Sequence, residues 1–343
     1  MKTFARLSTE ERAVFVEQAA THLGLPAGSV EKDFWVCWTL RALFELPEWG
    51  ASLTFKGGTS LSKGFRFIRR FSEDLDVVID RERLGFGGAN SPDQAPSLKQ
   101  RRIRLDRLRE ACQVAVERDI LPALRAAAAI ELGAAWADRV ALADADEDAD
   151  RQTVLVQYPS AFARALLYVR PVVKIEFGAR SDTEPSETPR ITPYVAEVLP
   201  TSMTDRDFAV KVVAARRTFL EHVCLLHEET FRPVEKPRKA RMARHYYDVW
   251  SLIRAGVGAE ALADEGLFER VAEHRPVFFK QTWVDYSQLR RGSIRILPPE
   301  EQRAAWAKDY NDMRQEMFWE DVPTFDDLLS DIATFEAEMN ASK

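Results

Sequence analysis

The sequence has little of what marks several common classes of protein. It contains only three cysteines among 343 residues, Cys37, Cys112 and Cys224, and their spacing matches no set of metal ligands. We therefore expect small buried side chains in a reducing compartment rather than a disulfide framework. The sequence also lacks a zinc signature, a Walker A lysine pattern and a Ser-His-Asp arrangement, which argues against a zinc finger, a P-loop hydrolase and a serine hydrolase.

Long apolar runs are missing as well. The first residues, Met-Lys-Thr-Phe-Ala-Arg-Leu-Ser, include no apolar stretch, and no segment reaches the roughly 18 apolar residues that cross a bilayer. We therefore expect a cytoplasmic protein without a membrane segment. The formal net charge of -6 is mildly acidic, which leaves nucleic-acid binding through local basic patches open.

The apolar content of 46% is sufficient for one large or two modest domains. Ser8 followed by Glu11 forms a capping box that predicts a helix over 9–23, and apolar spacing predicts another over 29–46. Further predicted elements are strands at 52–56, 75–79, 152–158 and 166–178, a helix over 59–67, a long basic helix over 99–132 that Pro122 kinks, and an acidic turn at 143–150.

The second part of the chain has a different pattern. From about residue 203 onward, apolar residues recur at helical spacing, for example between Phe208 and Leu226. We therefore predict two domains: a core with strands and N-terminal helices over residues 1–200, and a helical domain over residues 201–343.

The most informative stretch combines a glycine turn with two carboxylates. A predicted strand ends at the turn, and a helix-length gap separates the turn from Asp74-Leu75-Asp76. Carboxylates at positions i and i+2 of a strand project from one face, where they can hold a divalent metal ion. A glycine-rich turn lets the backbone approach a triphosphate. We therefore interpret Asp74 and Asp76 as metal ligands and Gly57, Gly58, Thr59 and Ser60 as nucleotide-binding residues.

A third carboxylate is expected on a neighbouring strand. Within residues 172–177, Lys174 and Glu176 share one face and the apolar residues share the other. Glu176 is the candidate third metal ligand, and Lys174 the candidate phosphate contact; the alternative is a solvated strand face with a local Lys–Glu pair. Nucleotidyl transfer uses two divalent cations about 4 Å apart, so this set predicts a nucleotidyltransferase that depends on Mg²⁺ or Mn²⁺ and consumes an NTP.

Several motifs, in the right order, resemble those of the AbiEii/AbiGii toxin nucleotidyltransferases. The most specific are Lys56-Gly-Gly-Thr-Ser-Leu61 and Arg70-Phe-Ser-Glu-Asp-Leu-Asp76. The resemblance extends over about residues 29–252. The other similar segments are Glu31-Lys-Asp-Phe-Trp-Val36, Arg217-Thr-Phe-Leu-Glu221, Leu226-His-Glu-Glu229 and Arg244-His-Tyr-Tyr-Asp-Val249.

This resemblance implies an α+β fold: a polymerase-β-like nucleotidyltransferase core with a mixed sheet flanked by helices, and a C-terminal helical bundle. It also implies the toxin of a toxin–antitoxin or phage-defence pair, with a cognate antitoxin as partner. Since some members modify the acceptor end of tRNA, an RNA acceptor is implied, in particular the tRNA 3′ end. Carried over by motif, Asp74 and Asp76 match the metal-binding pair, Gly58 and Ser60 match the nucleotide-binding turn, and Asp248 matches a late catalytic aspartate.

One position departs from the family pattern. The family usually has a lysine directly after the Arg-Thr-Phe-x-Glu run, where this sequence has His222. A histidine is only partly charged near neutral pH. His222 therefore either binds the nucleotide phosphates, shuttles a proton or is packed and inert, and the nearby cations Lys211, Arg216 and Arg217 are possible replacements for the lysine.

Two basic stretches bear on the acceptor. Residues 236–245 are the denser run, and we interpret them as binding RNA or nucleotide because Asp248 follows on the same predicted helix. Residues 99–109 are interpreted as a solvated helix face. For His227 and His245 we expect hydrogen-bonded structural roles.

Two other hypotheses remain open. The acceptor could be a protein or small-molecule hydroxyl, because such transferases share the same carboxylates. Alternatively, the chain could be a module that binds NTP without turnover, which the histidine at position 222 leaves possible.

Overall fold

A computed structural model describes residues 1–70, 72, 74–162, 170–318 and 322–341 of the chain. Contacts within the chain define two units. Unit 1 comprises Met1–Gly64 and Glu73–Val212, and unit 2 comprises Phe65–Ser72 and Val213–Lys343. The domain boundary near residue 200 stays a prediction, because contacts alone do not show which part folds independently.

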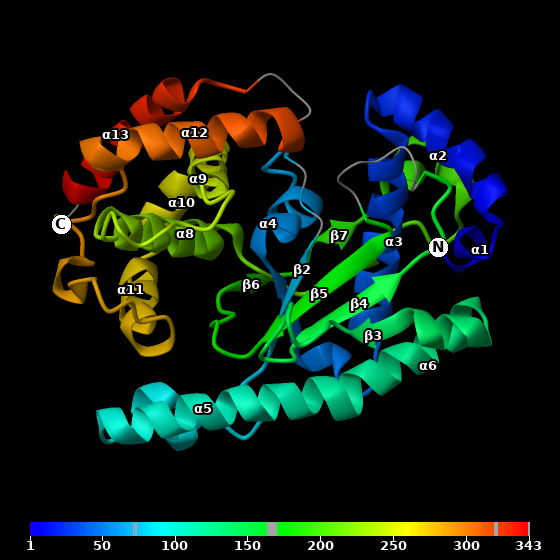
Figure 1. The fold of residues 1–343 in the computed structure, drawn as a ribbon, viewed down its shortest axis with the longest axis horizontal. Coiled ribbons are helices and arrows are strands. Elements are labelled where there is room, and N and C mark those ends of the chain that lie inside the picture. Colours follow the sequence, from blue (N-terminus) through cyan, green and yellow to red (C-terminus); the bar gives the residue numbers. More distant parts are fainter. Residues whose placement is uncertain (71, 73, 163–169, 319–321, 342–343) are drawn as a thin grey trace. The chain divides into compact units, whose positions relative to one another are not determined.

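Unit 1 contains a seven-stranded mixed sheet with the strand order β3-β4-β5-β2-β1-β9-β6 (Figure 1). Strand β2 (Leu75–Ile79) runs parallel to β5 (Val172–Gly178) and antiparallel to β1 (Leu53–Lys56). The strand predicted over 75–79 is confirmed, and part of the one predicted over 166–178 lies outside the described residues. The other strands of the sheet are β3 (Val140–Leu142), β4 (Thr153–Gln157), β6 (Ser186–Glu187) and β9 (Val212–Val213); β7 (Arg190–Ile191) and β8 (Phe208–Ala209) form a separate pair.

Helices pack against this sheet. Helix α2 (Thr9–Leu23) starts at the predicted capping box, in which Ser8 and Glu11 each accept a hydrogen bond from the other's backbone N–H. Helix α3 (Ala27–Phe44) packs against β5 and is buried along most of its length. The other α-helices of this unit are α1 (Lys2–Ala5), α4 (Gly57–Thr59), α5 (Leu98–Ala115), α6 (Leu121–Leu132) and α7 (Tyr194–Val198).

The long basic helix is continuous, as predicted. A π-helical turn, Val116–Ile120, joins α5 to α6 directly before Pro122 (Figure 1). Proline has no N–H, and its ring clashes with the carbonyl four residues earlier, so a regular α-helix cannot pass through it unchanged. The wider π turn lies where we predicted a kink.

Strand β5 has one apolar face and one polar face. Val173, Ile175 and Phe177 are buried, whereas Lys174 and Glu176 are partly exposed. This alternation confirms the predicted orientation of the strand. The apolar face contributes to the core beneath α3, and the polar face carries the partly exposed side chains of Lys174 and Glu176.

Unit 2 is helical, which confirms the predicted C-terminal helical part. Helix α8 packs against α9, α10 and α11, and α9 packs against α13. Edge-to-face aromatic contacts fill its core: Phe219 lies against Phe335, and Tyr246 lies against Trp306 and Phe325. Its helices are α8 (Ala215–Thr230), α9 (Arg244–Arg254), α10 (Val257–Ala263), α11 (Leu267–Phe278), α12 (Glu300–Met317) and α13 (Phe325–Ala341).

Two secondary-structure predictions are wrong. The helical pattern expected from residue 203 begins only at Ala215, because Val212 instead pairs with Phe55 of β1, a long-range contact that spacing does not reveal. The helix predicted over 59–67 is only α4 followed by a π-helical turn, Ser60–Gly64. Within the described residues, no helix has the length and apolar character needed to span a membrane.

Candidate functional site

A row of polar residues crosses the sheet of unit 1. In β2, Asp76 is opposite Glu176 of the parallel strand β5 and opposite Lys56 of the antiparallel strand β1. Residues in register on neighbouring strands project from the same face. Asp74 lies just before β2, and its charge acts on Lys174 of the same row. The structure therefore gathers the three carboxylates that were predicted as metal ligands on one side of the sheet.

The glycine turn lies directly beside this row. Gly57 follows β1 and has a φ of +80°, a conformation that residues with a side chain rarely adopt. A Cβ atom at this position would lie 2.0 Å from Oδ2 of Asp76. Only glycine allows the Asp76 carboxylate to approach the turn this closely, so the predicted nucleotide-binding turn and the predicted metal ligand are neighbours.

Lys174 and Glu176 form an ion pair next to Asp74 and Asp76. Their side chains are 41% and 42% exposed, so solvent and substrate can reach them. Partial burial lowers the pKa of Lys174. The hydrogen bond to Glu176 and the charges of Glu176 and Asp74 raise this pKa by more, so it lies above its usual value. Lys174 is therefore a permanent cation beside the carboxylates.

Thr59 and Ser60 are buried in the turn that follows Gly57. The Ser60 hydroxyl donates its proton to the Gly57 carbonyl at 2.8 Å. In this arrangement the hydroxyl closes the turn, and donation to a phosphate would need the side chain to rotate. Phosphate binding by these two hydroxyls stays a prediction.

Asp248, the late aspartate, lies in unit 2 and is fully buried on α9. It accepts two hydrogen bonds from the Arg70 guanidinium, from Nε to Oδ1 at 2.6 Å and from Nη2 to Oδ2 at 2.7 Å. Such a bidentate pair fixes both side chains. Arg70 is only 4% exposed, so this arginine is engaged in the fold rather than presented to RNA.

Helix α9 makes two further hydrogen bonds to the segment that contains Arg70. The Tyr247 hydroxyl accepts a hydrogen bond from the backbone N–H of Arg69 at 3.2 Å, and Ser251 Oγ donates to the Phe67 carbonyl at 2.6 Å. Residues 65–72 therefore belong to unit 2 although the sequence on both sides belongs to unit 1. This segment directly precedes Asp74 in the chain.

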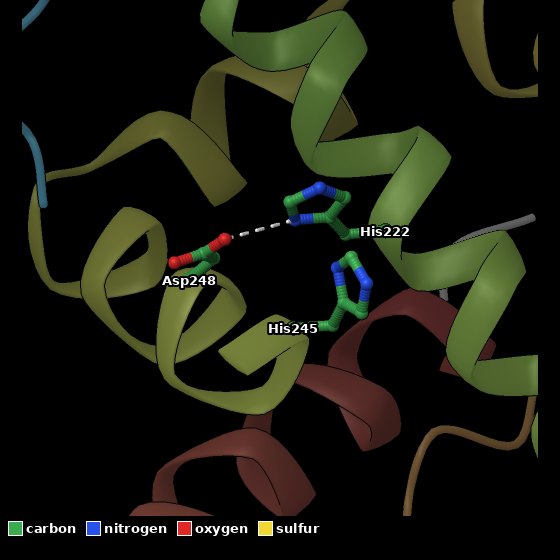
Figure 2. A group of neighbouring side chains, drawn as sticks. All are labelled: His222, His245 and Asp248. Atoms are coloured by element: carbon green, nitrogen blue, oxygen red, sulfur yellow. Dashed lines mark ion pairs between the residues drawn. The ribbon is translucent and has the colours of Figure 1, made fainter. Parts of the chain in front are cut away.

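His222, the departure from the family pattern, faces Asp248 from α8, with 3.8 Å between Nδ1 and Oδ2 (Figure 2). Burial lowers the pKa of His222 to about 4 despite the charge of Asp248, so the imidazole is neutral at pH 7. A neutral imidazole does not supply the positive charge of a lysine. The three cations considered as replacements are each engaged in ion pairs: Lys211 with Glu184, Arg216 with Asp264 and Arg217 with Glu221.

The prediction that the basic run 236–245 shares a helix with Asp248 holds only for its last two residues. Helix α9 begins only at Arg244, and the preceding residues form turns. Within the run, Arg238 stacks on Trp306 at 3.9 Å and donates to Glu229, so it helps to hold unit 2 together. Lys239 and Arg241 are exposed.

Sequence reasoning did not predict the surroundings of His245. The hydrogen-bonded role expected for His227 is confirmed, since its Nδ1 accepts from the backbone N–H of Arg295 at 3.1 Å. The same expectation for His245 is wrong: among the described residues its buried Nδ1 has no partner, and its ring lies edge-on to His222. The spacing of His245 and Asp248, three residues apart on one helix face, was the available signal.

Comparisons with known proteins give one family. Residues 38–331 match the family described as nucleotidyl transferase AbiEii toxin, type IV TA system. A comparison with curated proteins found no match. Among solved structures, the chain is similar to MenT4, nucleotidyltransferase toxin Rv2826c from Mycobacterium tuberculosis H37Rv, with 17% sequence identity over 87% of this chain and 98% of that chain. The TM-score of 0.34 does not establish a common fold.

Proposed function

This chain belongs to the AbiEii family of nucleotidyltransferase toxins of type IV toxin–antitoxin systems, and from that premise we propose that it transfers a nucleoside monophosphate from an NTP to an RNA hydroxyl. The proposed acceptor is the 3′ end of tRNA. The observation that supports this most directly is the register of Asp76 with Glu176, beside the Gly57 turn.

The carboxylates of the sheet fit a pair of Mg²⁺ or Mn²⁺ ions. Asp74, Asp76 and Glu176 offer only oxygen ligands, which these ions prefer, and they lie on one accessible face of adjacent strands. When bound, the metal ions neutralise the triphosphate and activate the attacking hydroxyl. Glu176 has a further task, since it forms an ion pair with Lys174 and can keep that ammonium beside the site.

The turn and the lysine would hold the nucleotide. Gly57 and Gly58 leave the backbone open to the triphosphate, Thr59 and Ser60 shape the turn, and Lys174 supplies positive charge. In the reaction, the acceptor oxygen bonds to the α-phosphorus, the bond from the α-phosphorus to the bridging oxygen breaks, and pyrophosphate leaves. The hydroxyl proton passes to a carboxylate of the site, Asp76 or Glu176.

We assign Asp248 a positioning role rather than contact with substrate. Its two oxygens are engaged by Arg70, and its side chain is fully buried. Through Arg70 it anchors residues 65–72, the segment that leads into Asp74. His222 supports this arrangement as a neutral side chain and does not replace the lysine as a phosphate-binding cation.

The partners follow from the family and from the exposed cations. A type IV toxin has a cognate antitoxin, and both would act in the cytoplasm. The exposed cations of the basic run, Lys236, Lys239 and Arg241, could contact RNA phosphates, a contribution that weakens as salt rises.

The test is nucleotide incorporation. Purified protein is incubated with total tRNA, Mg²⁺ and each α-labelled NTP in turn, beside the variant Asp74→Ala/Asp76→Ala. The matched control is Asp80→Asn, an exposed residue just after β2 whose amide can still accept the hydrogen bond from Glu82 N–H. Labelled RNA from the wild type and the control, but not from the double variant, is the expected result.

Other outcomes separate the remaining hypotheses. Label on protein or on a small molecule would replace the RNA acceptor while keeping the carboxylate chemistry. NTP binding without any labelled product, under every acceptor condition, would identify a binding module and overturn the proposed activity.

A further inference from the structure

Helices α8 and α9 bring two histidines and an aspartate together inside unit 2. His222 comes from α8, and His245 and Asp248 come from one face of α9 (Figure 2). One potential ligand atom from each residue can be chosen so that all three lie within 4.8 Å of one another. The sequence positions, 222 and 245–248, give no zinc signature, so only the fold reveals this group.

The two histidines have unused nitrogen atoms in a buried place. His222 and His245 are each 9% exposed, and among the described residues neither Nδ1 atom has a hydrogen-bond partner. A buried polar atom without a partner costs about 1–3 kcal/mol, so two at one point call for an explanation. Neither the sheet carboxylates nor the proposed transfer reaction uses His245.

We propose that His222, His245 and Asp248 form a binding site for one divalent transition-metal ion of the Zn²⁺ type. Two imidazole nitrogens with one carboxylate oxygen are typical ligands for zinc, cobalt or nickel and a poor set for Mg²⁺, which prefers oxygen. The site is therefore chemically different from the all-carboxylate group formed by Asp74, Asp76 and Glu176.

To accept the ion, the three ligand atoms, which lie within 4.8 Å of one another, must move closer together. Ligand atoms about 2.0–2.1 Å from a tetrahedral metal lie about 3.4 Å apart, and the His222 Nδ1 to Asp248 Oδ2 distance is 3.8 Å. Burial lowers the pKa of His222 to about 4 and lowers that of His245 well below its usual value, so no proton must be displaced near neutral pH.

Arg70 is the main opposing feature. Its charge disfavours a cation, but its two hydrogen bonds use only part of the capacity of the Asp248 carboxylate, which has about four lone-pair sites. Hydrogen-bonded partners of this kind commonly orient the carboxylates that bind metals. With three protein ligands, the ion would join α8 to α9 and keep one position for water.

The test measures metal binding without NTP or RNA, so its result is independent of the proposed transfer reaction. Tag-free, full-length protein is stripped of metal with a chelator and titrated with Co²⁺, which gives visible absorption bands in tetrahedral sites. We expect one equivalent to bind, Zn²⁺ to displace it, and excess Mg²⁺ to leave it in place. Thermal unfolding should shift upward with Zn²⁺, because the ion binds the folded state.

Two variants and one control assign the site. His245→Asn removes one ligand and should weaken Co²⁺ binding roughly 100-fold or more. His245→Phe keeps a ring against His222 without a nitrogen ligand and serves if the first variant folds poorly by circular dichroism. The control is His227→Asn, another buried histidine of α8 that lies outside the group.

Two results would overturn the proposal. One is a wild-type protein that takes up no Co²⁺ or Zn²⁺ after stripping. The other is equal binding by His245→Phe and His227→Asn, which would place any bound ion elsewhere.

Discussion

The ionisable side chains of the polar row on the sheet and those of the histidine–aspartate group in unit 2 differ in their exposure to solvent. In the row, Lys174 and Glu176 are more than 40% exposed, and their carboxylate neighbours are half-buried. In unit 2, Asp248 is 0% exposed, and its partner Arg70 is 4% exposed. The first arrangement leaves charges accessible to a substrate, whereas the second uses charge to fix the fold. Under the proposed function, the same residue type, aspartate, would serve catalysis in one place and positioning in the other.

Removing the buried carboxylate should have the largest effect on stability. Asp248→Asn removes one partner of a buried ion pair with the Arg70 guanidinium, a change that typically costs about 3–5 kcal/mol of unfolding free energy. Urea unfolding of metal-free protein measures it. The matched control is Asp207→Asn, which breaks an exposed bidentate pair with Arg190 and should change stability little.

The double variant Arg70→Met/Asp248→Leu sharpens this prediction. Removing both charges should recover much of the lost stability, because no unpaired charge then remains in the core. Nucleotide transfer is measured on the same double variant. If the variant is folded but transfers no nucleotide, the Arg70–Asp248 pair is needed to position residues 65–72 for catalysis. Equal losses of stability for Asp248→Asn and Asp207→Asn would erase the contrast between buried and exposed pairs.

The glycine turn gives the next largest expected effect. In Gly57→Ala, the new Cβ would lie 2.0 Å from Asp76 Oδ2 in a backbone conformation that costs about 1–3 kcal/mol for a residue with a side chain. Activity should fall more than stability, because Asp76 must move. Gly85→Ala is the control, since its φ is +83° and no atom lies within 4 Å of the added carbon. A similar loss of transfer in both variants would mean that strain, not contact with Asp76, is responsible.

The sequence allowed a good prediction of the polar row on the sheet but a poor prediction of the histidine–aspartate group in unit 2. Asp76, Glu176 and Lys174 lie on two strands whose alternation can be read directly from the residues, and Asp74 directly precedes the first of them. Their pairing in register is a long-range contact, yet the apolar faces of both strands restrict it strongly. Local pattern and tertiary structure agree there.

The contacts of Asp248 could not be read in the same way. Its partner Arg70 is 178 residues away, and nothing in the spacing of either segment reveals the bidentate pair. The helix predicted over 59–67 included Phe67, but the Phe67 carbonyl instead accepts a hydrogen bond from Ser251 of α9. The burial that makes His222 neutral likewise depends on the packing of α8 against α9, which the local spacing does not show.

A histidine outside the proposed metal site tests how burial controls charge in unit 2. Burial lowers the pKa of His227 to about 4, while the unfolded chain binds this proton near pH 6.5. Because the unfolded state then holds more protons, stability should fall as pH drops from about 6.5 to about 4, by about 2 kcal/mol between pH 7 and 5. In His227→Asn, whose amide can accept from Arg295 N–H, urea unfolding should show a weaker acid dependence; an unchanged dependence would contradict the assignment.

The smallest expected change in stability separates the two interpretations of Lys174. Lys174→Met breaks an ion pair that is largely solvated, so the unfolding free energy should change by less than about 1 kcal/mol. If Lys174 contacts the triphosphate, the KM for NTP should rise several-fold while the fold is intact. Lys308→Met is the matched control, because it breaks an exposed lysine–aspartate pair on α12. A KM that is unchanged in both variants would reduce Lys174 and Glu176 to a solvated strand face, and the metal ligands would then have to be sought among Asp74, Asp76 and their other neighbours.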